Sequence, residues 1–574
     1  MKNKSVETAP ADSSPEDVED SPLLISSVDS ESNIPESKEE KRTRLGVTLC
    51  ILFTELCERL TYYSIVGNLV LFLTNFLGFG SADAVTITLI FTGTCYFLPI
   101  VGGWLADSVA GCYNVIFGAG LIYIVGTFAL PLVAFDYSSW GWDNMSEGAK
   151  RGFFLFGLTL IAIGTAGIKA NVSPFGAQQL ESAGPHAVQV FFNWFYWFIN
   201  VGAVIAYGGV MYVQQEISFE IGYLIPAISM VVAVIIFVLA GKKYKRQPPG
   251  GSVLTRTFKI TTDAISIKKT SIYKYSSFLD FAKFSNGGDH IDKDVDDVKQ
   301  LGGILPVFGC IIFYNTVYSQ MGSTFLLQAE RMNLALGDFT LPAASLNLFD
   351  SLVILVLVPF MDRIVYPLLD KCWKRPSQLV RIGFGMILAV SSMVVAGILE
   401  IYRKEELSQS GGFSQEVAEK YFNASHYSVL LQVPQFVLIG ASEVFAMVTG
   451  LEFAYSEAPS SLKGVVMGMF LVTSGLGNYI GSLLINIVNA ATAGDEWYPD
   501  EINTGHLDYY FFLVGGLMML NTLVYFIIAY RYKKVKYKKK DYVIGYYKAD
   551  ASKYNRLTDE NNADVTVVDE AVDT

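Results

Sequence analysis

Long hydrophobic stretches separated by short polar segments recur along the chain. Charge-free examples cover residues 84–106, 108–135, 187–215, 221–241, 300–329 and 464–494. A helix of about 20 apolar residues spans a bilayer, so each of these stretches is long enough to cross one. The pattern predicts an all-α membrane protein with twelve transmembrane helices, at 46–76, 84–106, 113–136, 152–172, 188–213, 219–241, 300–327, 341–366, 378–401, 428–456, 463–492 and 508–530.

The polar segments divide these helices into two sets of six. We expect an N-terminal six-helix bundle at 46–241, a polar linker at 242–299 and a C-terminal six-helix bundle at 300–530. Residues 1–45 are rich in Ser, Glu, Asp and Pro and predict a disordered tail, and 531–574 form a second tail. Two such halves commonly enclose a substrate between them near the membrane midplane.

The distribution of lysine and arginine predicts the orientation. Basic residues gather in the linker and in the C-terminal tail. Positively charged segments stay in the cytoplasm, so the linker and both termini are expected there. Two glycosylation sequons, at Asn144 and Asn423, then fall on the opposite side. A third, at Asn171, lies at the expected cytoplasmic end of the fourth helix and should be unmodified.

Composition narrows the function further. The chain of 574 residues is 52% hydrophobic and 17% charged, and its net charge of −12 comes largely from the tails, so we expect a lipid bilayer and no nucleic acid as partner. The cysteines and histidines lack metal-ligand spacing. No Walker loop or nucleophile triad is present in the sequence. We therefore expect no metal, no organic cofactor and no enzyme activity.

The first predicted helix carries an unusual polar stripe. Glu55, Glu58, Arg59 and Tyr62 follow i, i+3, i+4, i+7 spacing and share one helix face, with Tyr63 beside them. Charges at membrane depth are costly and survive mainly where they face each other or a water-filled path. The stripe therefore predicts a polar site inside the bundle. The alternative is a helix start that lies in the headgroup region.

Lys169 follows the apolar run of the fourth helix and is expected to end it. A lysine there could extend to the cytoplasmic interface. The alternative is an ion pair with Glu55 or Glu58 across the bundle. Protonation of the acid would break such a pair, which is one way to couple a proton to movement.

Three further polar residues interrupt apolar helices. Glu443 lies well inside its span and must be protonated, paired or bound to a cationic ligand. The same argument applies to Asp350, for which a pair with a neighbouring helix is the alternative. Asn200 either binds a ligand or forms an interhelical hydrogen bond, and Gly202 permits close helix approach.

These motifs resemble the proton-dependent oligopeptide transporter family (solute carrier 15) of the major facilitator superfamily. Glu55-x-x-Glu58-Arg59-x-x-Tyr62-Tyr63 resembles its ExxERxxYY signature, and Gly-Ile-Lys169 and Phe195-Tyr-x-x-Ile-Asn200-x-Gly202 resemble two others. The resemblance implies that Arg59 and Lys169 contact the substrate carboxylate or the ExxER acids, and that Asn200 binds the peptide backbone. It also implies that Glu443 binds the substrate ammonium. Tyr62, Tyr63 and Tyr96 would line the pocket.

Within this family the chain is most similar to the lysosomal peptide/histidine transporter branch. Phe-Phe-Asn-Trp-Phe-Tyr-Trp from Phe191 and Gly-Leu-Glu-Phe-Ala-Tyr-Ser from Gly450 resemble that branch. The usual acid of helix 7 is replaced by Ser319 or Gln320, a pocket tryptophan by Phe470 and a pocket asparagine by Asp350. Asp350 is therefore our candidate for the proton acceptor of the C-terminal bundle, beside Glu55, Glu58, Arg59 and Lys169.

The resemblance implies a symporter that exports histidine and di- or tripeptides from the acidic endolysosomal lumen to the cytosol, with protons as coupling ion. The alternative is a lysosomal membrane scaffold that recruits a signalling adaptor, with or without transport. A nitrate transporter is a third possibility, which Glu443 disfavours. Glu19-Asp-Ser-Pro-Leu23-Leu24 fits an acidic dileucine signal for clathrin adaptors, and this predicts a lysosomal and endosomal membrane location.

Overall fold

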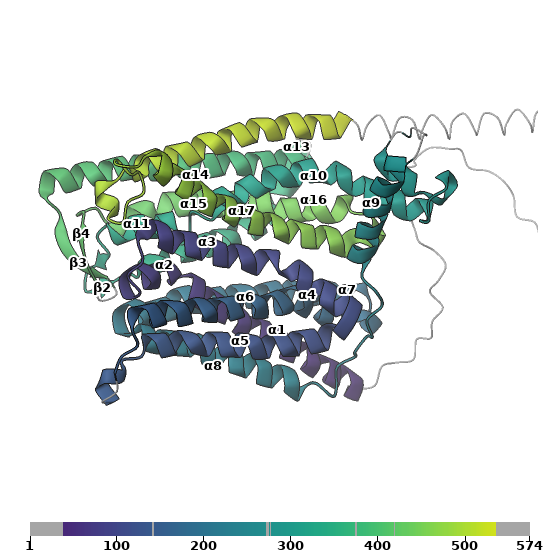
Figure 1. Ribbon diagram of the computed structural model, residues 1–574, viewed down its shortest axis with the longest axis horizontal. Helices are drawn as coiled ribbons and strands as arrows, with labels where there is room; N and C mark the ends of the chain where they lie inside the picture. The colour runs from purple at the N-terminus through teal and green to yellow at the C-terminus, as the bar shows by residue number, and fades with distance from the viewer. Residues whose placement is uncertain are drawn as a thin grey trace, which may run out of the picture.

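The computed structural model describes residues 38–534, apart from 141–142, 271–274, 276, 373–375 and 418–419. The predicted sorting residues Glu19, Leu23 and Leu24 lie outside the described residues. Long helices run side by side in two packed bundles, one from each half of the chain (Figure 1). The contact region between the two bundles is where the predicted substrate site would lie.

The N-terminal bundle consists of six long helical segments, several of which are broken by π-helical turns. Their bounds are α1 Lys38–Val66, continued by α2 Leu69–Leu71 and η1 Phe72–Phe76; α3 Ser81–Phe97, α4 Pro99–Leu105 and η2 Ala106–Ala110; α5 Cys112–Ala134; α6 Glu147–Gln178; α7 Pro185–Ile205, η5 Ala206–Val210 and η6 Val213–Ile217; and α8 Phe219–Leu239. Short 3-10 turns, η3 Tyr137–Trp140 and η4 Glu181–Ala183, lie in its loops.

The C-terminal bundle repeats this arrangement. Its segments are α10 Asp292–Tyr318 and α11 Thr324–Glu330; η9 Ala343–Leu346, α12 Asn347–Phe360, η10 Met361–Val365 and α13 Tyr366–Cys372; α14 Gln378–Ser410; η11 Val429–Gln432, α15 Val433–Glu443, η12 Val444–Val448 and α16 Thr449–Glu457; η13 Ser460–Leu462 and α17 Lys463–Ala491; η14 Ile502–Thr504; and a last helix, Leu507–Lys534. Two small antiparallel hairpins, β1 Ala335–Leu336 with β2 Phe339–Thr340 and β3 Phe413–Val417 with β4 Lys420–Ala424, are the strands of the described residues.

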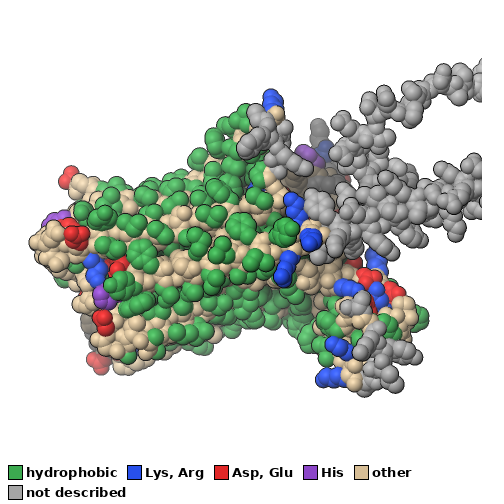
Figure 2. Space-filling model, turned by 90° about the horizontal axis from the view of Figure 1, so that it is seen from above, with side chains coloured by type: hydrophobic (Ala, Val, Ile, Leu, Met, Phe, Trp, Pro, Cys, Tyr) green, Lys and Arg blue, Asp and Glu red, His purple; other side chains and the backbone are tan. Residues whose placement is uncertain are grey.

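Eleven helices in the described part of the chain are long and apolar enough to cross a membrane. The helix α1 is as long, but its apolar stretch contains Glu55, Glu58 and Arg59. The side of the molecule in Figure 2 is covered mainly by hydrophobic side chains, whereas acidic and basic groups gather at its two ends. This distribution is the one that a bilayer requires of a spanning protein.

Several helix boundaries differ from the sequence prediction; for example, α10 begins at Asp292 rather than at 300, and α14 ends at Ser410 rather than at 401. The helix α1 begins at Lys38 rather than near residue 46, with Glu39 and Glu40 in its first turn, where acids favour a helix N-terminus. The helix α6 continues to Gln178, through Pro174, and does not end at Lys169. These differences arise because hydropathy identifies only the apolar part of a helix. A helix that continues beyond the apolar layer of the membrane keeps its backbone structure, and the hydropathy pattern does not show where it ends.

The two ends of the molecule differ. We call the end with the strands β1 to β4 the hairpin end, and the end with the linker helix α9 (Val253–Thr270) the linker end; α1 begins and the last helix finishes at the linker end (Figure 1). At the hairpin end the bundles are joined by hydrogen bonds from Ser81 Oγ to the Asp500 carbonyl (2.6 Å) and from Asn75 Nδ2 to the Val417 carbonyl (3.1 Å). The structure is therefore closed at the hairpin end.

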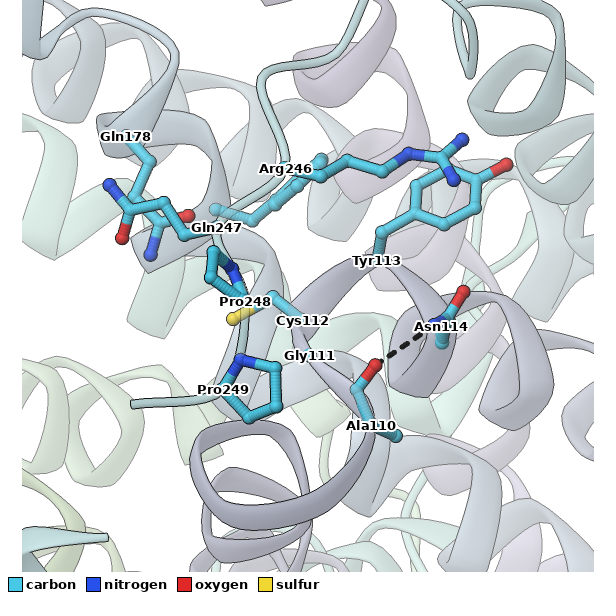
Figure 3. Close-up of a pocket in the computed structure, with 11 residues that line it drawn as sticks. Ala110, Gly111, Cys112, Tyr113, Asn114, Gln178, Arg246, Gln247, Pro248 and Pro249 are labelled. Atoms are coloured by element: carbon cyan, nitrogen blue, oxygen red, sulfur yellow. Dashed lines mark hydrogen bonds between the residues drawn. The ribbon is translucent and has the colours of Figure 1, made fainter. Parts of the chain in front are cut away.

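The linker is fastened to the N-terminal bundle. The side chain of Gln179 exchanges hydrogen bonds with the backbone of Lys245, at 2.7 and 3.0 Å. The Arg246 guanidinium lies 3.6 Å from the centre of the Tyr113 ring, and this pair borders a cavity of about 290 Å³ that Figure 3 shows between Gln247, Pro248 and the turn at 110–114. The linker then forms α9, η7 (Phe278–Ala282) and η8 (Phe284–Asn286) before it enters α10.

Candidate functional site

The polar stripe of α1 lies in the interior of the N-terminal bundle. Glu55, Glu58 and Arg59 are all buried. The Arg59 Nε lies 3.0 Å from Glu55 Oε1, and its guanidinium also contacts the Glu58 carboxylate. Gly202 of α7 permits this packing, since a Cβ there would lie 3.0 Å from the Cβ of Arg59. The charged groups are thus enclosed by protein, well inside a helix that begins at Lys38, and this favours the polar site inside the bundle.

Lys169 points into the same region. Its ammonium nitrogen lies 3.3 Å from the centre of the Tyr96 ring and 4.8 Å from that of Tyr62, so it does not extend to the interface. Burial strengthens such cation–π contacts. The nitrogen is buried without a hydrogen bond, and no carboxylate of the described residues lies within 4.0 Å of it. The predicted ion pair with Glu55 or Glu58 is thus not formed in this state, and the cation remains available to an anionic ligand.

Two further buried acids come from the C-terminal bundle. Asp350 of α12 and Glu443 at the end of α15 are close enough to interact electrostatically, and Tyr318 hydrogen-bonds to Glu443. Asp350 Oδ1 and Glu443 Oε2 are buried without hydrogen-bond partners. Among the described residues, neither acid has a basic group within 4.0 Å. The alternative that Asp350 is paired with Lys169 or Arg59 does not hold in this state, so both acids need a proton or a cationic ligand.

Tyrosines connect the basic and acidic sides. Tyr62 and Tyr96 pack edge to face with ring centres 6.5 Å apart, and Tyr63 lies 5.5 Å from Tyr207 of η5. Tyr207 belongs to the N-terminal bundle but is close enough to Asp350 and Glu443 of the C-terminal bundle to interact with them electrostatically. It therefore lies at the junction of the two bundles. Sequence reasoning identified Tyr62, Tyr63 and Tyr96 and missed Tyr207, although the glycines that follow it, Gly208 and Gly209, are a signal of irregular helix.

Tyr314 and Tyr318 of α10 are two further tyrosines that sequence reasoning missed. Their rings stack 6.5 Å apart, and the Tyr314 hydroxyl shares a 2.8 Å hydrogen bond with Ser442, the neighbour of Glu443. The helix changes from α to π geometry directly after Glu443, at η12, and π-helical turns are frequent at functional sites. The acid therefore lies where its helix is locally irregular.

Two other predicted residues have partners within their own bundle. Asn200 Nδ2 donates to the Tyr196 carbonyl at 2.8 Å, one turn back in α7, so the amide is not an interhelical bond in this state. Phe470 packs against Phe308 with ring centres 5.7 Å apart and borders Gly450. Neither of these contacts is with a charged group, so the part of Asn200 and Phe470 in substrate binding stays a prediction.

Ser319 and Gln320, which replace the usual acid of the seventh membrane helix, lie between α10 and α11. Ser319 Oγ donates to the Thr316 carbonyl (2.8 Å), and the Gln320 carbonyl oxygen Oε1 accepts from Thr324 Oγ1 (2.7 Å). These side chains satisfy the backbone and hydroxyl groups at the helix break. They have no proton to exchange in the ordinary pH range.

Two of the three sequon asparagines are exposed and one is buried. Asn144 and Asn423 are both exposed, and Asn423 is part of strand β4 at the hairpin end. Asn171 is buried and donates to the carbonyls of Gly102 and Gly167, at 3.1 and 2.8 Å. A glycosyltransferase cannot reach such a side chain, whereas the two exposed sequons are accessible. No group of three His, Cys, Asp or Glu side chains in the described residues could hold a metal.

Comparisons with known proteins agree on one family. The sequence model that describes the POT family matches residues 113–498 of this chain. Protein NRT1/PTR family 8.1 of Arabidopsis thaliana is 34% identical over 85% of this chain and 93% of its own length. Solute carrier family 15 member 3 of Mus musculus is 31% identical over 86% and 93%. A crystal structure of an auto-inhibited POT family peptide transporter aligns with a TM-score of 0.67 and 25% identity, over 84% of this chain and 97% of that one.

The fold is that of the major facilitator superfamily, with eleven described helices that are long and apolar enough to span a membrane and the long helix α1 beside them, and the predicted fold class is confirmed. The chain belongs to the POT family. The proteins of this family to which it is similar include membrane transporters, which agrees with the prediction that it is not an enzyme.

Proposed function

We propose that the chain is a proton-coupled symporter that moves histidine and di- or tripeptides from the acidic endolysosomal lumen to the cytosol by alternating access. The observation that carries this proposal is the division of charge across the bundle interface. On the N-terminal side Lys169 supplies a cation without a carboxylate partner, beside Arg59, which Glu55 and Glu58 share. On the C-terminal side Asp350 and Glu443 supply acids without a basic partner. A zwitterion has the complementary pair of charges.

The tyrosines between these groups explain tolerance of different side chains. Tyr63, Tyr207 and Tyr318 present broad apolar rings with a polar tip. Recognition of the two charged ends fixes the orientation of the substrate, and the rings leave the remainder less constrained. A free amino acid such as histidine and a short peptide both carry an ammonium and a carboxylate, so one site can accept both classes.

Uptake into proteoliposomes tests the proposal. We expect radiolabelled histidine and dipeptides to accumulate when the hairpin-end side is acidic, and nitrate not to accumulate, because two unpaired acids repel an anion. Collapse of the pH gradient with a protonophore should remove accumulation and leave exchange of internal for external substrate. Nitrate accumulation without histidine or dipeptide uptake would reject the proposed substrate class.

Location is a separate part of the proposal. The hairpin end would face the lumen, since the exposed sequons Asn144 and Asn423 lie away from the basic linker. The acidic dileucine signal at Glu19, Leu23 and Leu24 would recruit clathrin adaptors. The double variant Leu23→Ala with Leu24→Ala should move the protein from lysosomes to the plasma membrane in fluorescence microscopy. Unchanged lysosomal staining would mean that another signal directs sorting.

A further inference from the structure

Glu330 is a buried acid remote from the central site. It ends α11 at the hairpin end, beyond the apolar span that stops at Tyr318, and is 1% exposed. Its Oε2 lies 3.0 Å from Arg331 Nη1, whereas its Oε1 is buried without a hydrogen-bond partner. A buried carboxylate oxygen with no partner is costly when it is charged, and a proton removes most of that cost.

Glu330 lines a cavity of about 210 Å³ whose walls come from both bundles. The turn at 74–81 between the first two membrane helices forms the N-terminal wall, and Glu330, Arg331, Phe422 and Asp500 form the C-terminal wall with Lys420. The N-terminal wall is held in place by Arg151, which donates hydrogen bonds of 2.8 Å to the carbonyls of Leu77 and Gly78.

This cavity exists only while the hairpin end is closed. The hydrogen bonds from Ser81 to Asp500 and from Asn75 to Val417 fasten its two walls together. An alternating-access movement that opens the hairpin end must separate these walls, because they belong to different bundles. Separation would admit water to Glu330, so the environment of this carboxyl group differs between the closed and the open state.

The charges around Glu330 do not neutralise it fully. Arg331 and Lys420 favour the charged form, but the Nε of Arg331 is shared with Glu501 at 3.0 Å. Asp500 adds negative charge to the same cavity. The nearby Arg403 is paired with Glu400, and the N-terminal lining residues are uncharged.

Burial outweighs the attraction of the two cations. It raises the pKa of Glu330 from 4.5 to about 7, against the lowering effect of Arg331 and Lys420 and with the Glu501 charge adding to the increase.

We propose that Glu330 is a further proton-binding residue of the transport cycle, which takes up a proton when the hairpin end closes and releases it when that end opens. Protonation of Glu330 favours the closed state, and its side chain does not contact the substrate. The inference rests on the proposed function only through alternating access, and it applies whichever substrate is carried. Acid on the hairpin-end side would therefore select the closed state, and neutral pH would release it.

The expected effect of pH on the ratio of closed to open molecules follows from the linkage between proton binding and conformation. Glu330 in the open state is hydrated and has an ordinary pKa, so the closed state binds more protons and is favoured as pH falls through about 7. For a hydrated pKa of about 4.5 and a buried one of about 7, the ratio of closed to open molecules should fall roughly 20-fold between about pH 5.5 and about pH 7.5. Most of this change lies above the range in which exposed carboxyl groups titrate.

The distance between the two bundles at the hairpin end reports directly whether a molecule is closed or open. Spin labels on Asp83 and Glu496, two exposed positions on opposite bundles, would report closure in the full-length protein in nanodiscs without substrate. The labelled protein should change from short to long distances between about pH 5.5 and about pH 7.5. Glu330→Gln, which is neutral at every pH and has nearly the same shape, should remain at the short distances throughout.

Glu501→Gln is the matched control, because this acid also contacts Arg331 but is half exposed. It should keep the pH-dependent change. A Glu330→Gln protein that opens like the parent would overturn the proposal, and so would a parent protein whose distances do not depend on pH. A protein that shows the expected distances but carries neither histidine nor dipeptides would refute the proposed substrates and leave the role of Glu330 intact.

Discussion

The two bundles hold their buried acids in different ways. In the N-terminal bundle Glu55 and Glu58 share the guanidinium of Arg59. In the C-terminal bundle Asp350 and Glu443 have no basic group within 4.0 Å among the described residues, and each has a buried oxygen without a hydrogen bond. The N-terminal acids therefore share one fixed counterion, whereas the C-terminal acids have none among the described residues and need a proton or a ligand. A change at an N-terminal charge should affect folding, and a change at a C-terminal acid should affect transport.

Removal of the shared cation should have the largest effect. Arg59→Met leaves two acids without a counterion in the protein interior, so we expect a loss of about 3–5 kcal/mol in the free energy of unfolding and no transport. Thermal unfolding in detergent, followed by intrinsic fluorescence, measures it. Arg42→Met, at the exposed start of the same helix, is the control and should be nearly neutral. Similar melting of the two variants would show that Arg59 is not needed as a counterion.

Glu443→Gln should abolish transport and leave the fold intact. The amide keeps the shape of the side chain but loses its attraction to a substrate ammonium, and no basic partner is left unpaired. Histidine and dipeptide uptake should fall to the level of empty liposomes, while thermal unfolding is unchanged. Glu405→Gln, an exposed acid of α14, serves as control and should transport normally. Normal uptake by Glu443→Gln would exclude it as the ammonium site.

Asp350→Asn should have a narrower effect. An amide cannot take a proton, so pH-driven accumulation should be lost, whereas substrate binding and exchange of internal for external substrate should continue. Comparison of net accumulation with counterflow in the same proteoliposomes separates the two. Persistent accumulation under a pH gradient would place the proton route elsewhere, at Glu55 and Glu58.

The sequence predicted the features that depend on a single helix. The lengths of the apolar runs located the membrane helices, and i, i+4 spacing brought Glu55 and Arg59 to one face. The prediction that Lys169 ends its helix was wrong, because α6 extends beyond the apolar run and the lysine turns inward onto Tyr96. An aromatic ring can stabilise a buried ammonium, and spacing within one helix does not show that a ring from another helix is near.

Features that depend on two bundles could not be predicted. Tyr207 and Tyr318 gain their positions near Glu443 from helix packing across the chain. Sequence reasoning did not single out Glu330. Its isolation follows from contacts among segments near residues 80, 420 and 500, whose distances in sequence give no signal of their proximity.

The linker also touches both bundles. The hydroxyl of Thr255 in α9 accepts a 3.0 Å hydrogen bond from Trp104 of the N-terminal bundle, and the adjacent Arg256 lies 3.4 Å from Asp294 of the C-terminal bundle. Two neighbouring residues of α9 thus contact both bundles. When the bundles separate at the linker end, at least one of these two contacts must break, and this affects the rate at which the transporter changes conformation. A change in α9, far from the central charges, would alter the turnover number while the affinity for the substrate stays the same.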